Sequence, residues 1–300
     1  MFIKTNNMKI INPDVKLWLQ GDDKIKHVAK CARVCYGKES GNDEVLYENL
    51  EKNNHLSMFR HETYYAAIPT RHDLVYNTIC DYFHSSYIKY ITYGNYCYVI
   101  TNGNFMRDIF KSNPVLYKYI NKYQISFEEI KQIKPIWDKF ARYTFCVVTQ
   151  ISTSRELNRV SPNNISEQST RYVYEDGTIC QPHWLEEYSI YESLHGKYFI
   201  YKNGKEDDDI HRKAAIYVSQ CNSAFIAYKY LIDAGIHRQD ARGVLPLDTA
   251  TKCVYTYSID EWRHIIDLRY YGTTGKPHPN AKIIAGIIRN ELINLGYKFR

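Results

Sequence analysis

The chain has 300 residues, of which 44% are hydrophobic and 24% are charged. This composition excludes a disordered protein and supplies enough apolar residues for a sizeable core. The net charge of +6 favours anionic ligands such as nucleotides. An excess of this size is also common as a simple aid to solubility, so charge alone does not predict nucleic-acid binding.

Cysteine spacing and hydropathy narrow the class further. The eight cysteines include no CxxC pair, which argues against the common zinc motifs. Their even number permits disulfides, but in a chain of this length we expect buried free thiols and a reducing compartment. No apolar run approaches the roughly 18 to 20 residues of a membrane span. We therefore expect a cytoplasmic protein with no metal site and no membrane contact.

The predicted elements of the first half follow from apolar periodicity. Helices are predicted over 22–35, 42–52 and 70–84, strands around 9–18 and over 62–68, and two or three further helices over 104–139. Alternating Tyr and Ile residues about Gly94-Asn95 predict a hairpin over 86–101.

The second half begins with an apolar, β-branched run over 143–151 that predicts a strand. Thr153 with Glu156 three residues later, and Ser258 with Glu261, predict two helix-starting capping boxes. A polar loop is predicted over about 172–204. A long helix is predicted from 207 to Gly235, and a last helix ends at Gly296. We expect one α/β domain over 1–300, with insertions at about 104–139 and 175–206.

The densest group of polar residues lies over 153–172, where three arginines and two carboxylates occur among few apolar residues. A guanidinium binds phosphate in a bidentate manner, and hydroxyls with backbone amides can hold the remaining oxygens. A solvated loop would have the same composition. These residues alone therefore leave a nucleotide site and a solvated loop equally open.

A resemblance separates the two. The segment ends in Glu167-Gln168-Ser169-Thr170-Arg171-Tyr172, with Arg159 twelve residues before Arg171. This string resembles the signature of flavin-dependent thymidylate synthases. Three more segments resemble that family's motifs in the same order: Arg60-His61-Glu62-Thr63, then Asp240-Ala241-Arg242-Gly243-Val244-Leu245-Pro246, then Glu261-Trp262-Arg263-His264 leading to Leu268-Arg269. Each has an ordinary structural interpretation by itself, but their joint order and spacing favour the family.

The sequence also departs from the family's pattern. Where the signature has Arg-His-Arg, this chain has Arg159-Val160-Ser161. Asn164 and Ser166 replace the Ser and Asn in the middle of the signature, and Ser258 stands where an Asn commonly contacts flavin. These departures concern the flavin more than the substrate.

The resemblance implies an α/β (α+β) domain with a central, mostly antiparallel sheet flanked by helices, assembled as a homotetramer with sites shared between subunits. It implies reductive methylation of dUMP to dTMP, with methylenetetrahydrofolate as carbon donor and NADPH-reduced FAD as hydride donor. The cofactors then carry the difficult chemistry, and the protein supplies positioning and electrostatics. The partners expected are dUMP and further copies of the chain, not nucleic acid.

The resemblance also assigns residues. Arg269 is the candidate catalytic residue, stabilising negative charge on the uracil ring. The dUMP residues are Glu156, Arg159, Glu167, Ser169, Thr170, Arg171, Arg242 and Arg269. The FAD residues are His61, Thr63, Arg159, Val160, Ser161, Glu167, Ser258 and His264.

Two other functions fit the same sequence. A catalytically inactive nucleotide- or RNA-binding protein on this fold would bind dUMP or RNA without taking up flavin. A flavin reductase of other substrates would oxidise NADPH whether or not dUMP is present.

Overall fold

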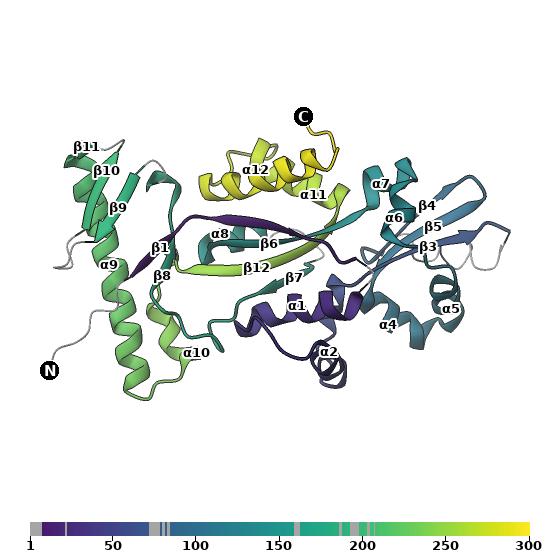
Figure 1. The fold of residues 1–300 in the computed structure, drawn as a ribbon, viewed down its shortest axis with the longest axis horizontal. Coiled ribbons are helices and arrows are strands. Elements are labelled where there is room, and N and C mark those ends of the chain that lie inside the picture. The colour runs from purple at the N-terminus through teal and green to yellow at the C-terminus, as the bar shows by residue number, and fades with distance from the viewer. Residues whose placement is uncertain are drawn as a thin grey trace.

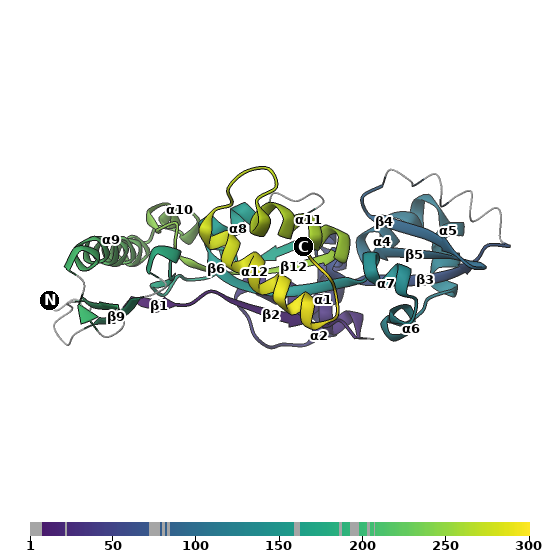
Figure 2. The same cartoon turned by 90° about the horizontal axis from the view of Figure 1, so that it is seen from above.

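The computed structural model describes residues 8–21, 23–71, 79, 82, 85–158, 163–185, 188–192, 198–202, 205–206 and 208–300. The molecule is elongated, with a four-stranded sheet in its middle and a smaller sheet towards each end (Figures 1 and 2). It is a mixed α/β fold whose central sheet is antiparallel and flanked by helices, which confirms the expected class.

The central sheet has the strand order β2-β6-β12-β7. Its strands are β2 (Asp14–Trp18), β6 (Arg142–Gln150), β12 (Ala250–Ser258) and β7 (Ile165–Glu167). Strands β6 and β12 pair along their whole length, from Ala250 opposite Gln150 to Ser258 opposite Arg142. This pairing brings residues about a hundred positions apart into register, and the site is built on it.

Helices cover both faces of this sheet (Figure 1). One face carries α8 (Ile151–Leu157), α11 (Ile259–Ile266), the π-helical turn η4 (Asp267–Tyr271) and α12 (Pro279–Asn294). The other carries α1 (Lys24–Tyr36), α2 (Asp43–Lys52) and the 3-10 helix η1 (Leu56–His61). Large side chains such as Phe145, Tyr255 and Trp262 fill the first interface, because the strands alternate their side chains between the two faces.

Residues 63–140 form a separate lobe beside the central sheet (Figure 2). A three-stranded sheet of order β3-β5-β4 is made by β3 (Thr63–Pro69), β5 (Tyr96–Asn102) and β4 (Ile88–Tyr93). Helices α4 (Gly103–Ser112), α5 (Pro114–Lys122), α6 (Phe127–Lys131) and α7 (Lys134–Phe140) complete it. The Arg142 guanidinium donates through Nη2 to the Arg60 carbonyl at 2.8 Å, so the two ends of the lobe meet at the central sheet.

The opposite end of the molecule is built around the long helix α9 (Asp208–Asp233). Strands β1 (Lys9–Ile11) and β8 (Thr178–Cys180) form a parallel pair, and β9 (Tyr188–Glu192), β10 (Tyr198–Lys202) and β11 (Lys205–Glu206) form a small sheet. The 3-10 helix η2 (His183–Leu185) lies between β8 and β9 in the chain, while α10 (Arg238–Ala241) and η3 (Arg242–Val244) follow α9. The region expected to be a loop over 172–204 therefore contains strands.

Some sequence predictions are confirmed and others are wrong. The hairpin turns at Gly94-Asn95, and the Ser258–Glu261 capping box starts α11. Thr153 does not cap a helix, because α8 already begins at Ile151 and the Thr153 hydroxyl donates to Gln150 Oε1 at 2.7 Å. Four helices occupy the stretch that was expected to hold two or three. The helix predicted over 70–84 lies mostly outside the described residues.

The seven described cysteines are free thiols, as expected. Within the described part of the chain, no helix has the length and apolar character that crossing a bilayer requires. The described residues also contain no group of three or more His, Cys, Asp or Glu side chains placed to hold a metal ion.

Candidate functional site

Residues of α8, β7, η3 and the segments that follow them surround a pocket of about 600 Å³, here called the Glu167 pocket. Four of the predicted dUMP residues line it: Glu167, Ser169, Thr170 and Arg242. Arg155 also lines it, so two guanidinium groups and one carboxylate share the pocket. Two cations beside hydroxyl groups are suited to binding an anionic oxygen group.

Glu167 is held firmly at the end of β7. Its Oε1 accepts hydrogen bonds from Ser154 Oγ at 2.7 Å and from Thr251 Oγ1 at 3.3 Å, and its Oε2 accepts from Asn158 Nδ2 at 3.4 Å. Sequence reasoning missed these partners. Ser154 and Asn158 are four residues apart at the end of α8 and therefore face the same side, which was the available signal. The Thr251 contact depends on the pairing of β12 with β7, which no local pattern reveals.

The loop after β7 is fixed by hydrogen bonds on both sides. The Ser169 amide donates to the Cys35 carbonyl at 3.1 Å, and the Arg171 amide donates to Ser169 Oγ at 3.3 Å. Thr170 Oγ1 accepts from Arg242 Nη1 at 3.0 Å. Arg242 thus reaches the loop across the pocket while remaining exposed to solvent. A bound anion would meet both the loop and the guanidinium.

Arg171 does not line the Glu167 pocket. It is exposed, and its guanidinium carbon lies 5.5 Å from the centroid of the Tyr172 ring. The structure therefore places it next to the other dUMP candidates in sequence but outside the cavity that they share.

Arg269 and Glu156, both predicted to act on dUMP, form an ion pair with 3.3 Å between Nη1 and Oε2. The Arg269 side chain is only 16% exposed, and its Nε has no hydrogen-bond partner. It lies in the π-helical turn η4, an irregular geometry that frequently occurs at functional sites. Glu156 lies on α8 with Ser154 and Arg155, although neither Arg269 nor Glu156 lines the Glu167 pocket.

His61, predicted to contact FAD, is fully buried at the end of η1. Its Nδ1 lies 2.8 Å from Thr256 Oγ1, which lies 2.7 Å from Thr144 Oγ1 on the opposite strand. Thr144 Oγ1 lies in turn 3.1 Å from His27 Nε2 of α1. Burial is the main cause that lowers the pKa of His61 to about 3 and that of His27 to about 4, so both imidazoles are neutral near pH 7.

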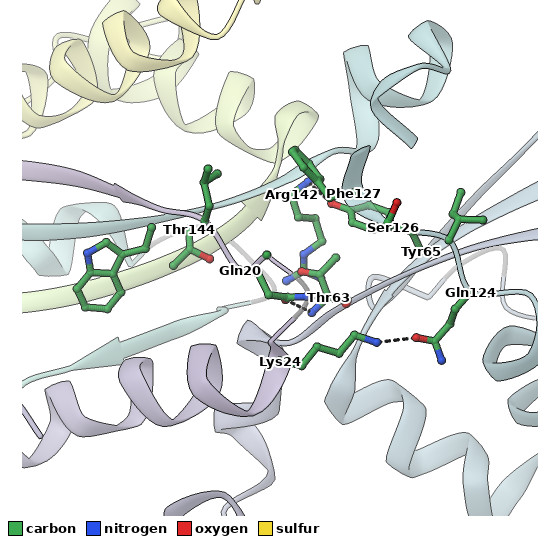
Figure 3. A pocket seen from close by; sticks show the side chains of 13 residues that line it. Gln20, Lys24, Thr63, Tyr65, Gln124, Ser126, Phe127, Arg142 and Thr144 are labelled. Carbon is green, nitrogen blue, oxygen red and sulfur yellow. Dashed lines mark hydrogen bonds between the residues drawn. The ribbon is translucent and has the colours of Figure 1, made fainter. Parts of the chain in front are cut away.

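Thr63 lies at the start of β3 and lines a different pocket, of about 290 Å³, between the 63–140 lobe and the central sheet (Figure 3). We call it the junction pocket. Its lining residues come from the end of β2, the start of α1, β3, the segment 124–127 and the start of β6.

The remaining FAD candidates are scattered. Ser258 is buried, and its hydroxyl and amide are both engaged with Glu261 in the capping box. His264 is exposed on α11. Arg159, Val160 and Ser161 lie outside the described residues. The Arg60 guanidinium donates to the Asn163 carbonyl at 3.0 Å, which places η1 beside the residue where the described chain resumes.

Comparison with known proteins identifies the family. The family described as "Thymidylate synthase complementing protein" matches residues 139–291, about half of the chain. The chain belongs to this family. The matched stretch includes the Glu167 pocket, the Glu156–Arg269 pair, Ser258 and His264, but it leaves out His61 and Thr63.

No curated protein sequence matches the chain. Solved structures that resemble it include a UMP/dUMP methylase, PolB from Streptomyces cacaoi, bound with 5-Br UMP or with 5-Br dUMP. These share 18% and 17% sequence identity with the chain and give TM-scores of 0.46 and 0.45. Each alignment covers 96% of this chain, with 92% and 93% of the other. Similarity of this size carries no argument about the site of this chain.

Proposed function

We propose that this protein is a flavin-dependent thymidylate synthase. It converts dUMP to dTMP, taking the one-carbon unit from methylenetetrahydrofolate and the hydride from FAD that NADPH has reduced. The observation that carries the proposal is that four predicted dUMP residues line one pocket inside the segment that matches the family.

The Glu167 pocket has the chemistry that a nucleoside monophosphate needs. Arg242 and Arg155 supply charge for the phosphate, and the Ser169 and Thr170 hydroxyls can complete its hydrogen bonds. Glu167, fixed by three donors, can accept from the ribose or from the edge of the base. The protein's part is to bind and orient dUMP so that carbon 5 of the uracil is presented to the reactants.

Arg269 acts on the charge that develops on the uracil ring. A buried guanidinium oriented by Glu156 needs no reorganisation during the reaction, and such preorganised groups contribute on the order of 3 to 4 kcal/mol to a barrier. Arg269 lies outside the Glu167 pocket of a single chain, so this role requires dUMP to extend beyond that pocket or a second subunit to complete the site.

The described FAD candidates are scattered over the single chain. The His61 ring is enclosed and hydrogen-bonded to Thr256, Ser258 caps its helix, and Thr63 lines a pocket about half the volume of the Glu167 pocket. FAD would supply the hydride when bound. In our proposal a homotetramer in the cytoplasm completes the flavin site from several chains.

Exposed apolar side chains close to Arg242 in the chain support an assembly. Leu247, which lines the Glu167 pocket, is 59% exposed, Ile236 44% and Val244 40%, and all three lie within six residues of Arg242 in the sequence. Apolar groups gathered beside a polar site are typical of a surface that a partner covers. A further copy of the chain is the partner that the proposal requires.

Three measurements on one purified sample distinguish the synthase from the two other functions considered. Uptake of FAD, binding of dUMP, and NADPH oxidation that depends on dUMP together support the synthase. Binding of dUMP without any uptake of FAD would favour the inactive nucleotide-binding protein, for which the scatter of the described FAD candidates is the motivating observation. NADPH oxidation indifferent to dUMP would favour a flavin reductase.

A further inference from the structure

The junction pocket contains a partly buried cation, Arg142, without a counter-ion. The guanidinium of Arg142 donates through Nη2 to the carbonyls of Arg60 and Thr256, at 2.8 and 3.3 Å, and its Nε has no hydrogen-bond partner. No described carboxylate forms an ion pair with it. Burial lowers the pKa of this guanidinium, and the acid that most opposes this shift, Glu261, has its carboxylate engaged in the cap of α11.

The rest of the lining adds positive charge and flat apolar surfaces. Thirteen residues line the pocket, and none of them is acidic (Figure 3). Lys24, in the first turn of α1, lines the pocket opposite Arg142, and its Nζ donates to Gln124 Oε1 at 2.6 Å. The aromatic residues Trp18, Tyr65 and Phe127 also line the cavity, with the Trp18 ring packed against Lys30.

A charge that is removed from water without a partner is costly, and a ligand that supplies the opposite charge would offset this cost. Concave sites with a few polar groups among apolar and aromatic walls are typical of small-molecule binding. A cavity of about 290 Å³ accepts a single ring with one charged group. It does not accept a dinucleotide such as FAD, although Thr63 lies in its wall.

We propose that the junction pocket binds a small anion that carries a flat ring, with its carboxylate or phosphate oxygens between Arg142 and Lys24 and its ring against Tyr65 and Phe127. This site is separate from the Glu167 pocket, since the two share no lining residue. It therefore does not depend on the proposed synthase activity.

A ligand in the junction pocket would also contact Thr144, which is connected by hydrogen bonds to His61, a predicted FAD residue. Thr144 lines the pocket and is hydrogen-bonded to Thr256, which is hydrogen-bonded to His61. The occupant would join residues of the 63–140 lobe to β2, α1 and β6 of the central layer. Binding should therefore stabilise the contact between the lobe and the sheet.

Calorimetric titration with benzoate tests this site directly. We expect saturable binding to the wild-type protein and at least a tenfold loss of affinity in Lys24→Met, since a hydrogen bond to a charged group is removed. The matched control is Lys26→Met, which removes an exposed lysine two residues along the same helix and should leave the affinity unchanged. Arg142→Met should abolish binding, provided that its circular dichroism and thermal unfolding show a folded protein.

Three outcomes would overturn the proposal. The first is the lack of saturable benzoate binding, and the second is an equal loss of affinity in both lysine variants. The third is a loss of benzoate binding in Arg242→Ala, which would place the probe in the Glu167 pocket. Inorganic phosphate serves as the ring-free probe: it should bind at least tenfold more weakly than benzoate, and equal affinity would contradict the role of the aromatic rings.

Discussion

In the Glu167 pocket a carboxylate held by three donors lies with two exposed arginines, whereas the junction pocket has a partly buried arginine, a lysine and no acidic residue. The first pocket combines charges of both signs. The second has positive charge alone. The comparison shows two different signs of a ligand site. One is a network of hydrogen bonds that holds a carboxylate in place, and the other is a cation for which the protein supplies no counter-ion.

The two pockets also differ in how the chain assembles them. Most of the Glu167 pocket comes from one stretch, 151–170, with a second contribution from 242–247. The junction pocket draws on five segments between Trp18 and Thr144. Lining residues that are close together in the chain form a recognisable sequence motif, and lining residues that are far apart do not.

The largest expected effect concerns Arg269, which belongs to neither pocket of the single chain. Arg269→Ala should lower the rate of dTMP formation by about 100- to 1,000-fold, corresponding to the loss of roughly 3 to 4 kcal/mol of transition-state stabilisation. Steady-state kinetics measures this. Arg263→Ala, which removes an arginine from the adjoining helix α11, is the control. Near-normal turnover in Arg269→Ala would remove its catalytic role.

The next effect separates the two pockets. Arg242→Ala should weaken dUMP binding by about 1.5 to 3 kcal/mol, the value of a hydrogen bond to a charged group, and should leave benzoate binding unchanged. Calorimetric titrations with dUMP and with benzoate measure the two affinities. Arg238→Ala, four residues earlier, is the control for a general loss of positive charge. An unchanged dissociation constant for dUMP would show that Arg242 does not grip the substrate.

A third change tests the network around Glu167. Glu167→Gln keeps the shape but removes the charge that three donors face, so we expect dUMP affinity and unfolding free energy each to fall by about 1 to 3 kcal/mol. Urea unfolding and calorimetry give the two values. A fully stable variant that binds dUMP normally would show that Glu167 is an ordinary surface carboxylate.

The smallest expected effect is a dependence of stability on pH. The pKa values of His61 and His27 are lowered to about 3 and 4, so below pH 6.5 the unfolded chain binds more protons than the native one. Each histidine should then cost about 2 kcal/mol of stability between pH 6.5 and 5. Burial raises the pKa of Glu175 to about 7, which acts in the opposite direction, because the native carboxyl takes up its proton first on acidification.

Glu175→Gln separates these contributions. At pH 8 the substitution removes a buried carboxylate charge and should raise the unfolding free energy by about 1 to 3 kcal/mol, a gain that shrinks as the pH approaches 4.5. The variant should also lose stability more steeply than the wild type between pH 6.5 and 5. Parallel curves for the two proteins would mean that Glu175 does not titrate as its burial implies.

The sequence predicted those features that depend on residues near one another. The Ser258–Glu261 capping box, the turn at Gly94-Asn95 and the grouping of Ser169 and Thr170 with Glu167 all follow from local spacing. The Thr153 prediction failed because β6 passes directly into α8, so a good capping pair stands inside a helix that has already begun.

Features that depend on strand pairing could not be predicted from the sequence. The line of hydrogen bonds from His61 through Thr256 to Thr144 exists because β12 and β6 pair in one register, and nothing near His61 indicates it. The burial of Arg142 likewise depends on how the 63–140 lobe closes onto the sheet. Whether the stretches 104–139 and 175–206 are insertions stays a prediction.

The most direct test of the central claim is formation of dTMP from dUMP, methylenetetrahydrofolate and NADPH by the purified protein, with FAD added or omitted. The proposed function predicts product that depends on FAD and is lost in Arg269→Ala. If no dTMP forms with FAD present while dUMP still binds, the chain is a nucleotide-binding protein of this family and not a synthase.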